Sequence, residues 1–194
     1  HPGRLITVDT PLFELVVAEK GGQIQELKLK KFKASVGPGA KLKSLIQADA
    51  GGANMRFGLE GSSVPGLASA VYTAAGDPER ITVRERAEKL TLAWNSVEGM
   101  AITKTFTFHP DSYLIDLDVQ VVNRSGRPLK DRATLAVSRD IGESKRSVVF
   151  EGPNGFIDDK LQEVAVKDIE EKPDTSGMVN WVGIVDRYFM SALI

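Results

Sequence analysis

Residues 100–122, MAITKTFTFHPDSYLIDLDVQVV, decide the fold class of this chain. They hold two runs in which apolar and polar residues alternate, which is the pattern of half-buried β-strands. Pro110 and Asp111 between the runs are a turn signal, so the stretch predicts a β-hairpin. Lys104 interrupts the apolar face of the first run, which predicts a bulge or an edge position at that point.

Short runs of β-branched and aliphatic residues recur on both sides of this hairpin. Gly21 and Gly22 lie between two of the runs and can supply the positive φ of a tight turn, and the segments 76–78, 123–128 and 152–155 are also rich in turn residues. Many short strands separated by turns indicate antiparallel sheets that pack face to face. The sequence therefore predicts an all-β protein, a large antiparallel β-sandwich. The other predicted strands are 5–8, 13–18, 24–29, 81–84, 90–94, 133–137 and 148–150.

Residues 34–70 differ from the rest because they contain seven glycines. We expect a long irregular excursion from the sandwich, with short strands near Leu45 and Phe57. No boundary between two domains is visible, so residues 4–194 are predicted to form a single domain. The opening His1-Pro2-Gly3 lacks a Met and is expected to be a cloning remnant or the site of a cut within a longer protein.

The composition excludes several classes of function. The chain has 194 residues, 25 Lys and Arg, 26 Asp and Glu, and a net charge of −1. A nucleic-acid-binding protein usually carries a basic excess, so we expect no nucleic-acid partner. The absence of cysteine excludes disulfides, thiolate metal sites and cysteine nucleophiles.

Few residues could carry catalysis. His109 follows the first run of the hairpin and has only Asp111 nearby in sequence, so we interpret it as an exposed turn histidine. Asp116 and Asp118 share one face of the second run, where carboxylates most often meet solvent. Lys28, Lys30, Lys31 and Lys33 indicate a solvated strand face or a guarded edge, with weak attraction to anionic lipid headgroups as the alternative.

The C-terminal residues 178–194 change their period. On a helix the apolar residues would fall on one broad arc, which is the spacing of an amphipathic helix. We expect this helix to follow a sandwich that spans about residues 4–176. Its aromatic arc either packs on a sheet or forms an interface with a partner or a membrane, and both alternatives stay open. The residues of this candidate interface are Trp181, Ile184, Val185, Tyr188, Phe189 and Leu193.

Three segments together resemble the large periplasmic domain of the YidC family of membrane protein insertases of Gram-negative bacteria. The first is 6–13 with Gly21-Gly22 and 27–32, and the second is 103–106 with Tyr113 and 119–123. The third comprises Trp181-Val182, Tyr188-Phe189 and Ala192. The resemblance extends over about residues 6–194 and is faint from 34 to 75.

The resemblance implies a sandwich similar to that of galactose mutarotases, followed by a short C-terminal amphipathic helix. It implies a non-catalytic domain without cofactor or metal, in the periplasm, attached to an inner-membrane insertase and chaperone. The implied partners are Sec translocon components (SecDF and SecYEG), the membrane surface near the C-terminal helix and, through the parent protein, nascent membrane proteins. The competing hypothesis is a carbohydrate-binding or mutarotase-like protein, for which Trp94 and Trp181 are the stacking candidates.

Overall fold

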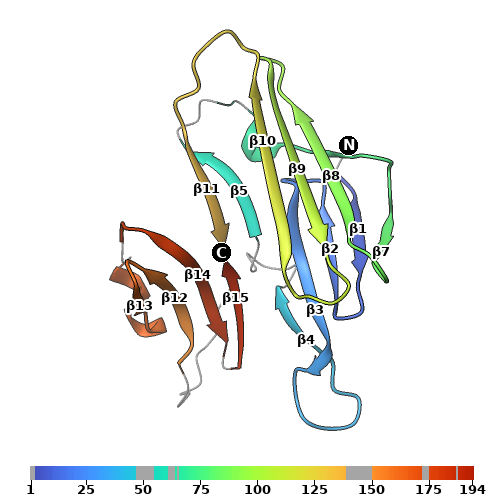
Figure 1. Cartoon of the computed structure of the whole chain (residues 1–194), viewed down its shortest axis with the longest axis vertical. Helices are drawn as coiled ribbons and strands as arrows, with labels where there is room; N and C mark the ends of the chain where they lie inside the picture. The colour runs from blue at the N-terminus through green and yellow to red at the C-terminus, as the bar shows by residue number, and fades with distance from the viewer. Residues whose placement is uncertain are drawn as a thin grey trace.

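The computed structural model of this chain describes residues 3–46, 55–60, 64, 66–138, 150–171, 175–186 and 188–194. Within these ranges the chain consists mainly of β-strands, which form three sheets (Figure 1). All strand pairs are antiparallel except β1 with β7, which run parallel. The predicted all-β sandwich is confirmed.

The first sheet has the strand order β11-β5-β3-β2-β1-β7, with β4 paired to β3 beside this path. Its strands follow the predicted runs closely, because short β-branched segments bounded by turn residues favour extended backbone. The two short strands expected within the glycine-rich excursion are present as β4 and β5. The strands are β1 Leu5–Asp9, β2 Phe13–Ala18, β3 Gln23–Lys33, β4 Leu42–Ile46, β5 Met55–Glu60, β7 Arg80–Thr82 and β11 Arg132–Val137.

The second sheet contains the predicted hairpin and has the order β10-β9-β8-β6. Its strands are β6 Thr73–Ala74, β8 Glu88–Asn95, β9 Met100–Phe108 and β10 Ile115–Asn123. The strands β9 and β10 pair in one unbroken register from Ile115 opposite Phe108 to Asn123 opposite Met100. The alternation in the sequence therefore gives each strand one face toward the core and one toward solvent.

The main hydrophobic core lies between the first and second sheets. Its side chains come from alternate positions of the strands, as a period of two requires. Burial of each large apolar side chain contributes roughly 1.5–3 kcal/mol to folding. The buried core residues on these strands are Ile6, Val8, Phe13, Leu15, Val17, Ile24, Leu27, Leu29, Ile46, Ala74, Leu90, Leu92, Ile102, Phe106 and Phe108.

Lys104 lies inside this core, so the predicted bulge or edge position is wrong. Strand β9 runs between β8 and β10 without a register shift, and the residue is 1% exposed. Its ammonium group donates hydrogen bonds to the carbonyl oxygens of Gly21 at 2.7 Å and Gly22 at 3.2 Å. It also lies 4.6 Å from the centre of the Tyr72 ring, a favourable cation–π arrangement. Burial lowers the pKa of Lys104 to about 8.

The third sheet has the order β13-β12-β14-β15, and it corrects a prediction. Residues 152–155 were expected to form a turn, yet they begin β12. Both glycines of this segment lie against other backbone: a Cβ at Gly155 would be 3.1 Å from the carbonyl oxygen of Trp181. Here glycine permits close packing of chains, not a turn. The strands of this sheet are β12 Gly152–Ile157, β13 Lys160–Glu163, β14 Val179–Asp186 and β15 Phe189–Leu193. The 3₁₀ turn η2 Val166–Glu171 lies between β13 and β14, and a second one, η1 Leu67–Ser69, lies between β5 and β6.

The predicted C-terminal helix is wrong, because residues 179–186 and 189–193 are the paired strands β14 and β15 of a C-terminal hairpin. Strand β14 pairs with β12 on one side and with β15 on the other. Asp186 pairs with Phe189, so this polar residue, which disfavoured a strand, lies at the end of β14. Backbone hydrogen bonding to β12 and the β-branched residues of β14 favour the extended conformation over the helix.

The remaining strand predictions have mixed outcomes. Strand β7 lies at 80–82 instead of 81–84. The strand expected at 148–150 falls largely outside the described residues. Of the predicted turns, the one at 123–128 is present: the Asn123 side chain accepts a hydrogen bond from the Ser125 amide at 3.0 Å.

Candidate functional site

The six residues of the candidate interface do not form one continuous arc. In an antiparallel pair, residues opposite one another share a face. Ile184, Phe189 and Leu193 therefore lie on one face of the C-terminal hairpin, and Trp181 and Val185 lie on the other. These five side chains are partly buried, whereas Tyr188 at the turn is 83% exposed. The six residues are thus divided between the two faces of the hairpin and its turn, and among them only Tyr188 at the turn is largely exposed.

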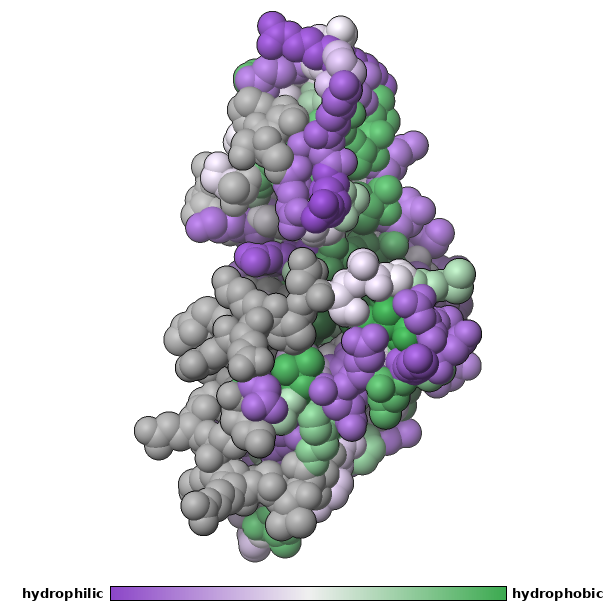
Figure 2. Space-filling view, turned by 90° about the vertical axis from the view of Figure 1, so that its left-hand side faces the viewer, coloured by the Kyte–Doolittle hydropathy of each residue, from purple (hydrophilic) through white to green (hydrophobic). Residues whose placement is uncertain are grey.

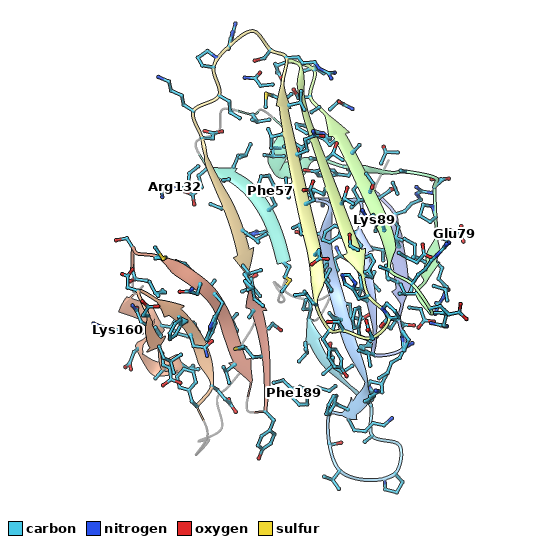
Figure 3. All side chains as sticks on the ribbon, in the orientation of Figure 1. Phe57, Glu79, Lys89, Arg132, Lys160 and Phe189 are labelled. Atoms are coloured by element: carbon cyan, nitrogen blue, oxygen red, sulfur yellow. The ribbon has the colours of Figure 1, made fainter. Side chains whose placement is uncertain are left out.

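Phe189 fastens this hairpin to the sandwich. Its ring meets the Phe32 ring edge to face, with centroids 5.2 Å apart and an angle of 80° between the planes. The Lys43 ammonium group lies 5.4 Å from the centre of the same Phe189 ring. Figure 3 shows Phe189 at the end of β15 that lies toward the β3–β4 hairpin. Tyr188 and Met190, its neighbours in sequence, are left exposed at this end of the molecule.

Sequence reasoning missed the partners of Phe189. Phe32 stands among the lysines of β3, which the sequence marks as a solvated face, and Lys43 follows a glycine-rich loop. Their contact with residue 189 depends on the order of the sheets, which local pattern does not contain. The one available signal was an aromatic residue within a lysine run.

Asp9 on β1 connects β3, the first strand of the β3–β4 hairpin, to neighbouring parts of the chain through ion pairs. Its side chain is 10% exposed, and it forms ion pairs with Lys30, with Arg84 at 2.8 Å and with Arg80 at 3.3 Å. The hydrogen bond from Lys30 is the largest cause that lowers the pKa of the Asp9 carboxyl well below its usual range, although burial opposes it. The cluster joins β1, β3, β7 and Arg84, which follows β7.

We expect Asp9→Asn to lower the free energy of unfolding at pH 7 by about 2 kcal/mol, the usual worth of charge-assisted hydrogen bonds. Because the pKa is lowered in the folded state, the stabilisation is present above pH 3.8 and is lost as the pH falls below it. Urea unfolding of both proteins between pH 7 and about pH 3 measures this. The difference between them should shrink as the pH falls, and a constant difference would contradict the assignment.

The side chains considered for catalysis, and interpreted from the sequence as surface groups, lie at the surface. The Nε2 atom of His109 is 2.8 Å from Oδ2 of Asp116, and these side chains are 32% and 53% exposed. The partner is therefore Asp116, not Asp111. Asp118 is also exposed, as predicted. The two tryptophans lie in different sheets, since Trp94 is on β8 and Trp181 on β14, so they offer no shared stacking platform for a sugar.

The described part of the chain offers few alternative sites. It contains no group of three or more His, Asp or Glu side chains placed to hold a metal ion. Among the same residues no helix has the length and apolarity needed to cross a membrane. On the side of the molecule seen in Figure 2, hydrophobic residues lie in small groups separated by hydrophilic ones. The described residues on that side thus lack the wide apolar patch of a large hydrophobic interface.

Comparison with known proteins places this structure in a family. The family described as YidC periplasmic domain matches residues 5–194. The membrane protein insertase YidC of Geobacter sulfurreducens is 31% identical over 190 residues, which cover 96% of this chain and 35% of that protein. The membrane protein insertase YidC of Maridesulfovibrio salexigens is 30% identical over 204 residues, which cover 99% of this chain and 36% of that protein. The chain therefore spans about a third of the length of these relatives. It belongs to the YidC periplasmic domain family, as its sequence predicted, and its location is the periplasm.

Proposed function

We propose that this chain is the non-catalytic periplasmic domain of an inner-membrane insertase and chaperone, and that residues 4–194 act as one domain. In this proposal the domain assists insertion and folding of membrane proteins by contacting Sec translocon components such as SecDF and SecYEG. Nascent membrane proteins are reached through the parent protein. The family match over residues 5–194 supports the proposal.

The observation that carries the proposal further is the exposed end of the C-terminal hairpin. Phe189 is held against Phe32 and the core, while Tyr188 is 83% and Met190 48% exposed. Tyrosine and methionine are enriched where proteins meet partners or the bilayer surface. Of the six predicted interface residues, Tyr188 therefore makes the contact directly, and Phe189 positions it.

A photo-reactive amino acid at position 188 of the full-length insertase tests this in cells. We expect cross-links to a Sec component or to lipid, and we expect none from position 161, because Leu161 on β13, which is also exposed at 56%, lies outside the hairpin. The variant Tyr188→Ser with Met190→Ser should lower insertion of a membrane protein severalfold without changing the free energy of unfolding. Equal cross-linking at 188 and 161, or full insertion by the variant, would reject this surface.

The carbohydrate-binding alternative has less support. A sugar site of the mutarotase kind needs an acid and a base that face one enclosed substrate. His109 and Asp116 lie on exposed surface, and the two tryptophans are on separate sheets. The arrangement therefore favours the insertase domain.

A further inference from the structure

The β3–β4 hairpin concentrates positive charge at one end of the molecule. Residues 27–46 contain six lysines and no Asp or Glu, although the whole chain has a net charge of −1. The remainder of the chain is therefore acidic overall. Figure 1 shows this hairpin extending beyond the sandwich at the lower end of the view. The lysines are Lys28, Lys30, Lys31, Lys33, Lys41 and Lys43.

Three of these lysines have no charged partner among the residues that the structure describes. Lys28 pairs with Glu26 at 2.7 Å, and Lys30 pairs with the buried Asp9. The ammonium groups of Lys31, Lys33 and Lys41 are exposed and form no ion pair or hydrogen bond with any residue that the structure describes. Three unpaired cations on one short hairpin attract an anionic surface.

Exposed apolar groups accompany these cations. Val36 at the tip of the hairpin is 105% exposed, and Phe32 is 42% exposed. The contact of Phe32 with Phe189 brings the C-terminal turn, with its exposed Tyr188, to the same end of the molecule. Lysines around an apolar tip, with a tyrosine beside them, are the features of a segment that lies in the bilayer interface.

We propose that the β3–β4 hairpin docks the domain on anionic phospholipid headgroups, with Lys31, Lys33 and Lys41 on the phosphates and Val36 entering the interface. The occupant is a lipid surface because the lysines and the apolar tip lie together on a narrow protruding hairpin. Such a segment can place its lysines among the headgroups and its apolar tip in the interface below them. The inference rests on the proposed position beside the inner membrane. It adds a second contact to that of the C-terminal hairpin and orients the domain relative to the bilayer.

Co-sedimentation of the 194-residue chain with vesicles tests the proposal without any insertion assay. We expect binding to vesicles of phosphatidylglycerol and phosphatidylcholine, and little binding to phosphatidylcholine alone or at high salt. Each lysine near an anionic membrane strengthens binding roughly fivefold. The triple variant Lys31→Gln, Lys33→Gln, Lys41→Gln should therefore bind roughly a hundredfold more weakly. Val36→Ser should weaken binding severalfold and preserve the salt dependence.

The control is the double variant Lys89→Gln, Lys160→Gln, which removes two positive charges where the hairpin variant removes three. Both lysines are exposed, and Figure 3 shows them on β8 and β13, away from the hairpin. This variant should bind like the unaltered chain, and thermal unfolding confirms that all variants are folded.

Equal binding by the hairpin and control variants would overturn the proposal, as would failure of the chain to bind anionic vesicles. If a hairpin variant keeps its lipid binding but no longer cross-links to an acidic polypeptide, the partner of the hairpin is a protein and the lipid proposal is wrong. If position 188 gives no cross-links but the hairpin variants still lose vesicle binding, the proposed function is contradicted and the inference about the hairpin stands.

Discussion

Stability should rise with pH in the alkaline range because of one buried lysine. The pKa of Lys104 is about 8 in the folded protein and 10.5 as an ordinary value. Between these values the unfolded chain holds more protons than the folded one, so deprotonation favours folding. We expect the free energy of unfolding to rise by about 2 kcal/mol between pH 7 and pH 9.5 through this group.

The variant Lys104→Met isolates this contribution. It should lack the alkaline rise, and at pH 7 it should be about 1 kcal/mol more stable than the unaltered protein, because removing a buried charge gains more than the two hydrogen bonds to Gly21 and Gly22 lose. Urea unfolding at several pH values measures the difference. Keeping below pH 10 excludes Tyr72, whose pKa burial raises to about 12.

Lys89→Met is the control, because Lys89 is exposed on the adjacent strand β8. Its stability should change with pH in parallel with that of the unaltered chain. If the stability of Lys104→Met also changes with pH in parallel with that of the unaltered chain, the desolvation of the Lys104 ammonium group that the structure indicates is contradicted. The result matters for the fold because Lys104 ties the β2–β3 turn, on the first sheet, to the centre of the second.

The sandwich was predictable because its information is local. In β9 and β10 each residue reveals its face by the period of two, and the register follows from a short turn. The same alternation placed Lys104 inward. The error lay in treating a lysine as incompatible with the core, although its stem is apolar and glycine carbonyl oxygens can accept hydrogen bonds from its ammonium group.

The candidate site was less predictable because its parts are distant in sequence. Two strands joined by a short turn place apolar residues at spacings that also fit a helix, so Tyr188 and Phe189 were assigned to the wrong element. No sequence pattern from residue 179 to residue 193 indicates that β12 supplies backbone hydrogen-bond partners for β14. The sequence indicated only the lysines of β3 as a basic segment. Lys41 lies close to them because β3 pairs with β4, and this pairing is not evident from the local sequence.

Gly152→Ala should be the most damaging small substitution in the third sheet, with a loss of about 4 kcal/mol from the free energy of unfolding. Gly152 has φ +144°, and an added Cβ would lie 2.4 Å from the backbone carbonyl oxygen of Val164. The Val164 amide donates a hydrogen bond to the carbonyl oxygen of Pro153 at 2.9 Å. The backbone therefore cannot move away without breaking this bond.

Gly37→Ala separates the two causes of that loss. Gly37 has φ +129°, yet a Cβ there meets nothing within 4 Å, so its substitution carries only the backbone strain of about 1–2 kcal/mol. Denaturant unfolding gives both losses, and their difference is the cost of the close approach at Gly152. Because β12 pairs with β14, Gly152→Ala should also speed hydrogen exchange in the C-terminal hairpin, while Gly37→Ala should not. Equal losses in the two variants would show that backbone conformation alone, and not the close approach to Val164, requires glycine at 152.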